Sequence, residues 1–202
     1  MDTHRQAPIG RPRGFDADEA LERAMRVFWD KGYEGASLTD LTAAMGISRT
    51  SMYAAFGNKE ELFRKALARY AEGPASYGAR ALREPTARQV ATAFLNGSVL
   101  TTTQSGCPAG CLGVQGSLAT GVPGRGAHDA LVAWRGDAVS DLRDRFQQAV
   151  REGDLPPDAD PDLLARYLAT VSNGIAVQAA SGATRDELQR VADMALRTWP
   201  RA

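Results

Sequence analysis

Residues 37–62, SLTDLTAAMGISRTSMYAAFGNKEEL, carry several helix signals in close succession, and this stretch decides the fold. Ser37 with Asp40 three residues later is a carboxylate variant of the capping box that begins a helix. Gly46 ends that helix, and Ser48 is a good N-cap for the next one. Apolar residues at helical spacing on both sides of the glycine can hold the two helices at a steep angle. The stretch therefore predicts a helix-turn-helix.

The second helix of this pair has a polar face opposite its apolar anchors, Met52 and Phe56. Such a helix can enter the major groove of DNA, where Arg49 can offer a bidentate fork to guanine. Its neighbours, and Lys59 just inside the next helix, can reach base edges or phosphate oxygens. The DNA-contact candidates are Arg49, Thr50, Ser51, Tyr53 and Lys59. From the residues alone, a helical hairpin over 38–57 with a solvated polar face is an equal alternative.

The rest of the chain also has helical periodicity, and no β pattern competes with it. The first helix begins at Asp16 and meets a capping glycine at Gly32, and a fourth helix begins at Asn58 and ends before Gly73-Pro74. The later helices are expected at 86–105, 108–119, 127–152, 160–181 and 184–198. The sequence therefore predicts an all-α protein of about nine helices.

The breaks divide the chain into three parts. Residues 1–14 are rich in Pro, Gly and Arg, which predicts a flexible basic arm. Residues 15–72 form a three-helix domain with the helix-turn-helix and a connecting helix, and Gly73-Pro74 marks its end. Residues 73–202 form a larger helical domain.

Composition excludes several classes of protein. Basic and acidic residues number 24 each, so a net charge of zero does not by itself indicate a nucleic-acid binder. Cys107 and Cys111, with His4 and His128, are too few for a disulfide scaffold or a zinc module, so we expect no metal and no cofactor. Because no Ser/His/Asp, Cys/His or paired-carboxylate set stands out, we expect no enzyme.

The chain shows no targeting or membrane segment. Its first thirty residues are polar and contain arginines, and no apolar run reaches the roughly 18 residues that mark a membrane helix. We therefore expect a cytoplasmic protein that does not contact the membrane.

The run from Ala20 to Tyr70 resembles the N-terminal domain of TetR-family regulators. The marks are Gly-Tyr at the end of the first helix, SLTDL at 37–41, AMGIS at 44–48, MYAAF at 52–56 and NKEEL at 58–62. The resemblance implies a homodimeric repressor that an unknown small-molecule effector releases from a palindromic operator in double-stranded DNA. It carries DNA contacts over to Arg49, Thr50, Ser51, Tyr53 and Lys59, and it adds Thr39. Ala54-Ala55 depart from the bulkier residues common before the phenylalanine in the family, so the resemblance does not carry phosphate contacts over to that edge.

The arm also resembles the basic extension of many such regulators. Arg11 and Arg13 flank a proline, and a short Arg-Pro-Arg segment can enter an A·T-rich minor groove. The alternative for this arm is a solubilising tail.

The last two predicted helices form a terminal pair that can build a four-helix dimer interface. The resemblance implies the same interface. The candidate residues are Leu164, Leu168, Val171, Ile175, Leu188, Val191, Ala195, Leu196 and Trp199. Periodicity alone gives even weight to a second interpretation, in which these stripes fill the core of one protomer.

The family resemblance further implies an effector pocket in the larger domain. The pocket candidates are Phe94, Cys111, Gln115, Trp134, Tyr167 and Asn173. Aromatic walls with a few polar groups suit a small organic ligand, although the same residues could serve the core or an interface.

Residues 106–112, GCPAGCL, resemble a Gly-Cys-Leu element of one branch of the family. The thiols of Cys107 and Cys111 could form a redox pair, bind a soft metal or react with an electrophile, which makes a thiol- or metal-responsive regulator the alternative function. The favoured interpretation is a packed Cys111 and an inert Cys107 at a helix start. A further rival is a structural DNA binder that has no effector.

Overall fold

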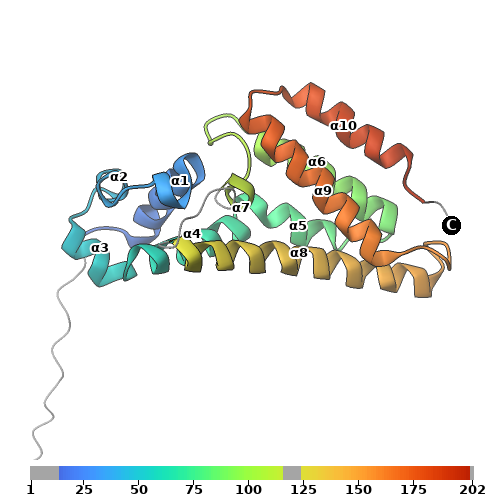
Figure 1. Cartoon of the computed structure of the whole chain (residues 1–202), viewed down its shortest axis with the longest axis horizontal. Helices are drawn as coiled ribbons and strands as arrows, with labels where there is room; N and C mark the ends of the chain where they lie inside the picture. The colour runs from blue at the N-terminus through green and yellow to red at the C-terminus, as the bar shows by residue number, and fades with distance from the viewer. Residues whose placement is uncertain (1–13, 116–123, 201–202) are drawn as a thin grey trace, which may run out of the picture.

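The computed structural model describes residues 14–115 and 124–200, and within these ranges it contains ten α-helices, one 3-10 turn and no strand. Helices α1 to α3 gather at one end of the molecule, and the long helix α8 runs from there toward the opposite end (Figure 1). Helices α9 and α10 belong to the larger half of the molecule, which comprises α5 to α10. The predicted all-α fold with a helix-turn-helix and a second helical part is confirmed.

The first three helices are α1 (Ala17–Gly35), α2 (Leu38–Met45) and α3 (Arg49–Phe56). Ser37 and Asp40 form a reciprocal capping box at α2, as predicted. Hydrogen bonds from Ser37 and Lys31 lower the pKa of Asp40 to about 2, which keeps the cap ionised. Gly46 ends α2 in the left-handed conformation (φ 69°), so the chain turns directly into α3.

Helix α4 (Lys59–Glu72) connects this part to the larger half. Asn58 and Glu61 form its capping box, and Gly73 ends it. The sequence predicted no helix between residues 73 and 85, but a 3-10 turn (Pro74–Ser76) leads into the short helix α5 (Tyr77–Ala81). The prediction missed α5 because five residues cannot show a periodicity and α5 has no side-chain cap.

Four helices of the larger half match their predicted ranges. They are α6 (Ala87–Thr102), α8 (Arg125–Glu152), α9 (Pro161–Ala180) and α10 (Arg185–Arg197).

The predicted helix at 108–119 is wrong at its start. Helix α7 (Leu112–Gln115) begins four residues later, and residues 116–119 lie outside the described part of the chain. Gly110 takes a positive φ of 87°, which a helix does not accommodate, and its amide bonds back to the carbonyl of Thr102. Cys107 therefore lies in a turn, and Cys111 lies immediately before α7.

Two apolar cores divide the molecule. The first joins α1 to α4 but also takes in Leu112, Ala127 and Leu131 from α7 and α8. The second joins α5, α6, α8, α9 and α10. Because the first core extends beyond residue 72, the two halves are packed together rather than linked by a free hinge.

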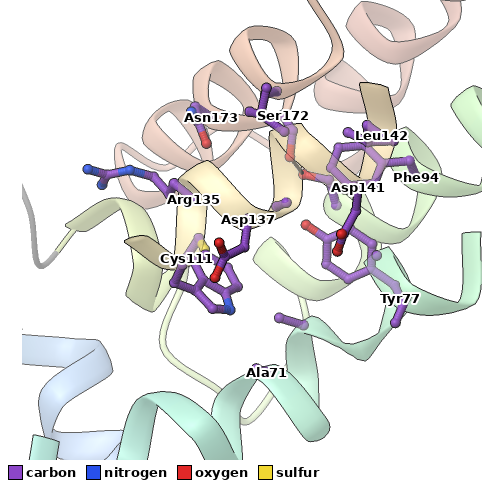
Figure 2. Close-up of a pocket in the computed structure, with 18 of the residues that line it drawn as sticks. Ala71, Tyr77, Phe94, Cys111, Arg135, Asp137, Asp141, Leu142, Ser172 and Asn173 are labelled. Carbon is purple, nitrogen blue, oxygen red and sulfur yellow. Dashed lines mark hydrogen bonds between the residues drawn. The ribbon is translucent and has the colours of Figure 1, made fainter. Parts of the chain in front are cut away.

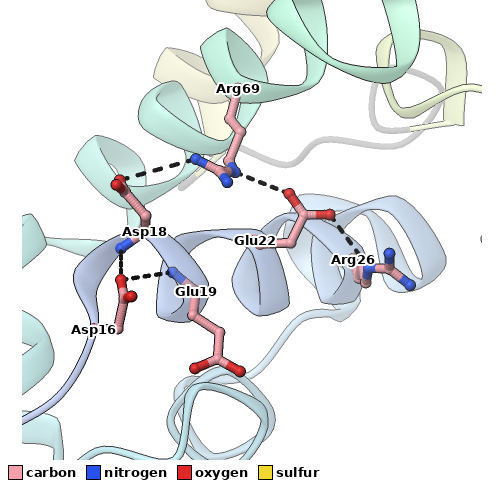
Figure 3. A network of polar contacts seen from close by, with 6 residues as sticks. All are labelled: Asp16, Asp18, Glu19, Glu22, Arg26 and Arg69. Carbon is pink, nitrogen blue, oxygen red and sulfur yellow. Dashed lines mark hydrogen bonds and ion pairs between the residues drawn. The ribbon is translucent and has the colours of Figure 1, made fainter.

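Ion pairs also connect helix α1 to helix α4. Arg69 on α4 pairs with Glu22 on α1 at 2.8 Å and reaches Asp18 at 3.9 Å (Figure 3). Asp18 also donates its amide to Asp16, the N-cap of α1. Because these ion pairs are partly exposed, they add little to the free energy of unfolding. Their main effect is to favour one alignment of α1 along α4.

No helix in the described ranges is long and apolar enough to cross a membrane.

Candidate nucleic-acid interface and ligand cavity

Helix α3 presents a polar face to solvent. Arg49, Thr50 and Tyr53 are exposed, and Tyr53 keeps 47% of its surface despite its aromatic ring. Met52 and Phe56 on the opposite side are buried in the first core. The face predicted for DNA contact is therefore free.

Three hydrogen bonds order this face. The guanidinium of Arg49 donates to the hydroxyl of Thr39, at the start of α2, over 2.9 Å. The hydroxyls of Ser51 and Ser48 lie 3.0 Å apart, and Ser48 caps α3 by accepting from the amide of Ser51. Ser51 is half-buried and occupied by the cap, so Arg49 and Thr39 form the more accessible pair.

Lys59 lies half-buried at the first position of α4. Its ammonium is 4.4 Å from the centre of the Tyr33 ring. Burial lowers the pKa of Lys59, and the nearby carboxylate of Glu34 works in the opposite direction. Sequence reasoning found Lys59 but gave no sign of its contact with Tyr33, which is 26 residues away along the chain.

Arg11 and Arg13 lie outside the described residues. The described chain begins beside α3, because the ring of Phe15 packs against Phe56 with centroids 6.5 Å apart. Gly14 and Phe15 also border a shallow cleft with Ala54. The described chain thus begins next to α3.

A cavity of about 300 Å³ lies between α5, α6, α8 and α9, with α7 at one end (Figure 2). Of the predicted pocket residues, Phe94, Cys111, Trp134 and Asn173 line it. Gln115 and Tyr167 are not among the lining residues. Gln115 donates to the carbonyl of Ala109, and Tyr167 is exposed on α9.

The cavity wall contains a buried hydroxyl cluster that sequence reasoning missed. The hydroxyl of Ser172 donates to that of Ser98 over 2.9 Å, and both hydrogen-bond with Tyr77. Burial raises the pKa of Tyr77 to about 12, so its hydroxyl stays protonated at neutral pH. These residues come from three different helices, and no local motif joins them.

Two carboxylates, Asp137 and Asp141, also line the cavity from one face of α8. Both are exposed residues on its open side, and Figure 2 shows Asp141 beside Tyr77. Neither carboxylate has an ion-pair partner among the described residues. Arg135 lines the same cavity, and its guanidinium donates to the neutral carbonyl of Gly113. The charged lining residues are thus two carboxylates and one guanidinium, which leaves an excess of negative charge at the mouth.

Cys111 lies at the end of the cavity nearest the helix-turn-helix part. Its thiol is buried, and burial raises its pKa, while hydrogen bonds from Tyr70 and from the amides of Gly113 and Val114 oppose that rise. Cys107 is half-buried in the adjoining turn, and both thiols are free. The predicted packed position of Cys111 agrees with its burial. Within the described residues, no group of three or more metal-binding side chains is assembled.

An aromatic series connects the cavity with α1. The ring of Trp134 lies against Tyr70 of α4 at 6.2 Å, and Tyr70 lies against Trp29 of α1 at 4.9 Å. The turn that carries the cysteines joins the same helix, because Trp29 donates to the carbonyl of Gly110 and Arg26 to that of Gly106. A change in the cavity wall can therefore reach α1 through direct contacts.

Most of the predicted dimerisation residues face inward. Leu168, Ile175, Leu188, Ala195, Leu196 and Trp199 are buried in the second core, and Leu164 and Val171 pack against it. Only Val191 is exposed. The sequence identified the apolar stripes but not their partners, and these stripes fill the protomer. Besides Val191, the outward faces of α9 and α10 carry four apolar residues that were not predicted for dimerisation: Leu163, Tyr167, Val177 and Met194.

Comparisons with known proteins agree with this architecture. Residues 20–66 match the family described as bacterial regulatory proteins, tetR family, and residues 88–195 match the tetracyclin repressor-like C-terminal domain. The chain is 33% identical over 193 residues to the HTH-type transcriptional repressor ComR of Escherichia coli K12, spanning 95% of this chain and 92% of ComR. It is 32% identical to the HTH-type transcriptional repressor AcnR of Corynebacterium diphtheriae, over 87% of each chain.

Among solved structures, a cysteine-substituted variant of the TetR family transcriptional regulator CifR, complexed with 26-base-pair operator DNA, superposes with a TM-score of 0.90. Its sequence is 44% identical, and the match covers 94% of this chain and 100% of that one. With both of its parts matched, this chain belongs to the TetR family of DNA-binding transcriptional regulators, which are not enzymes.

Proposed function

We propose that this protein is a repressor that binds a palindromic operator as a homodimer and leaves it when a small molecule occupies the cavity. The observation that carries operator binding is the exposed face of α3, where the guanidinium of Arg49 hydrogen-bonds to the hydroxyl of Thr39. The names of ComR and AcnR as repressors, and the operator complex of CifR, support it.

In this proposal α3 lies in the major groove. Arg49, Thr50 and Tyr53 reach base edges or phosphates, and Thr39 and Lys59 contact the backbone on either side. The capping box of α4 occupies the amides of Asn58 and Glu61. The amides of Lys59 and Glu60 have no acceptor among the described residues, so they can join Lys59 in binding a phosphate. The arm with Arg11 and Arg13 enters the neighbouring minor groove.

The partner of the outward faces of α9 and α10 is a second copy of the chain. Leu163 on α9 keeps 62% of its surface exposed and Met194 on α10 keeps 64%, which is unusual for large apolar residues unless they are covered. A groove lined by residues of both helices includes Val177 and Val191, which are also exposed. Symmetric pairing of these faces gives the two recognition helices a fixed separation, which must be about 34 Å to fit successive major grooves.

The effector of this proposal is a small, mostly apolar molecule that carries a positive charge or a hydrogen-bond donor. Phe94, Trp134 and Tyr77 supply aromatic walls, and Asp137 and Asp141 supply acceptors at the mouth. The two carboxylates have no cation partner among the described residues, so they disfavour an anionic ligand. Occupancy displaces Trp134 and, through Tyr70, alters the position of α4 and α1. Ligand and operator then oppose each other by linkage.

A thiol-responsive regulator is the second candidate. It is favoured by one observation: the turn that carries both cysteines hydrogen-bonds to α1 through Trp29 and Arg26. Modification of Cys107 or Cys111 would strain those bonds. Replacing both cysteines with serine separates the two candidates. If the protein responds only through its cavity, the variant keeps its response to the effector. If the protein is thiol-responsive, the variant loses a response to oxidant or electrophile that the wild type shows.

The experiment that tests operator binding is a selection from random duplexes at controlled salt. The wild-type chain should enrich a palindrome, Arg49→Ala should lose it, and Val132→Ala, an exposed change on α8, should not alter it. A folded, dimeric wild-type protein that enriches no sequence would contradict specific operator binding.

A further inference from the structure

The ring of Tyr33 is immobilised by its surroundings. A kink at Gly32 (φ 67°, ψ 178°) redirects the chain before the end of α1, a conformation that glycine adopts without steric cost. The Tyr33 ring then stacks on Phe28 at 6.2 Å with an interplanar angle of 10°. The rings of Phe63 and Tyr33 meet nearly at right angles, with centroids 5.3 Å apart. With 7% of its surface exposed, the ring is part of the first core and cannot reorient.

The ring nevertheless has one charged neighbour. The ammonium of Lys59 lies 4.4 Å from its centre, within the range of a cation–π contact. Lys59 is the first residue of α4, where the positive end of the helix dipole disfavours a cation. The negative face of the Tyr33 ring offsets that repulsion and holds the ammonium beside the start of the helix.

A free lysine side chain loses much rotamer entropy when it binds a phosphate. A lysine that already rests on an aromatic face loses less. We propose that Tyr33 is a positioning residue for operator DNA: its ring holds the Lys59 ammonium beside the N-terminus of α4 in the place where a DNA phosphate binds. The inference rests on the phosphate contact of Lys59 proposed above. Tyr33 acts through Lys59 and does not itself need to touch DNA.

A double-mutant cycle in the full-length dimer tests the inference. Four proteins are compared: wild type, Tyr33→Leu, Lys59→Ala and the double variant. Their affinity for the duplex that the wild type selects is measured by fluorescence anisotropy at fixed salt. Tyr33→Leu should weaken binding by about two- to fivefold per protomer when Lys59 is present and should have no effect when Lys59 is alanine. Tyr33→Phe keeps the aromatic face and should bind like the wild type.

Controls separate positioning from folding. Phe146→Leu removes a buried ring from the second core, away from Tyr33 and Lys59, so it should leave the affinity of the folded protein unchanged. If Tyr33→Leu does not fold, Tyr33→Met takes its place in the cycle. If Tyr33→Leu weakens DNA binding equally with Lys59 present and with Lys59 replaced by alanine, the inference is overturned. The phosphate contact of Lys59 is not affected by that result. An unchanged affinity in Lys59→Ala would instead overturn the phosphate contact itself, and the positioning role with it.

Discussion

The indole nitrogen of Trp29, on the first helix, donates a hydrogen bond over 3.1 Å to the carbonyl oxygen of Gly110, 81 residues later. Trp29 is fully buried, and Gly110 belongs to the turn that carries the two cysteines. This bond joins helix α1 directly to the residue before Cys111, which lines the cavity. It makes the cysteine turn a part of the interface between the two halves.

Trp29→Phe should lower the free energy of unfolding by about 1–3 kcal/mol, because it leaves the Gly110 carbonyl buried without its donor. Chemical denaturation at a fixed protein concentration measures the change. Arg26→Ala is the matched control, since Arg26 donates to Gly106 in the same turn from an exposed position and should cost less than about 1 kcal/mol. Equal costs for the two variants would contradict a special role for the buried bond.

Gly113→Ala should displace the ring of Trp134. A methyl group at Gly113 would overlap that ring, so the change should destabilise the protein by about 1–3 kcal/mol and shift the tryptophan fluorescence. Adding Trp134→Leu should recover part of the loss. Gly136→Ala on α8 is the control, because open space surrounds its added methyl group and it should be neutral or stabilising. A stable Gly113→Ala protein with unchanged fluorescence would argue against the close packing.

The acidic mouth of the cavity predicts the charge of its ligands. In a thermal-shift screen of small aromatic amines and carboxylic acids, amines should stabilise the protein and acids should not. Asp141→Asn should weaken the binding of an amine by about two- to fivefold. Asp144→Asn lies on the same helix outside the lining and should leave binding unchanged. Acids that stabilise the protein as well as amines would exclude this ligand class.

The thiols should differ in reactivity with pH. Burial raises the pKa of Cys111 above the ordinary value of 9.0 for a cysteine thiol. Its reactive thiolate is therefore scarce in the folded protein until the pH exceeds that value. At pH 8 iodoacetamide should therefore modify half-buried Cys107 first and reach Cys111 mainly after unfolding. Mass spectrometry of digested protein measures both rates. Fast modification of Cys111 in the folded protein would show an accessible thiolate and favour the thiol-responsive candidate.

The exposed faces of α9 and α10 should hold the dimer together. Replacing Val191 and Met194 with glutamate should give a folded monomer that no longer binds a palindromic duplex tightly, because buried charges without partners oppose association. Sedimentation measures the mass and circular dichroism measures the helix content. Val132→Glu places a charge on an exposed site of α8 and should leave the dimer intact. A dimer that survives the double change would locate the interface elsewhere.

Local signals in the sequence were enough to predict the helix-turn-helix. Ser37, Ser48 and Asn58 cap helices with groups no more than three residues away, so the sequence alone specifies where these helices begin. For the face that carries Arg49, the resemblance to a known family decided between DNA contact and a solvated hairpin. The same local reasoning failed at residues 108–111, where a helix was expected and Gly110 instead takes a positive φ in a turn.

Other features depend on contacts between residues far apart in the chain. The sequence by itself determined the all-α class, most helix limits and the apolar stripes, because capping and periodicity act within a few residues. Only the tertiary structure decided that Leu168 and Ile175 face the protomer's own core, while Leu163 and Val177 face outward. It also brought Tyr77, Cys111 and Asp137 together around one cavity and placed the ammonium of Lys59 over the ring of Tyr33. A stripe of apolar residues specifies that a helix face is buried, but which partner buries it depends on how the helices cross.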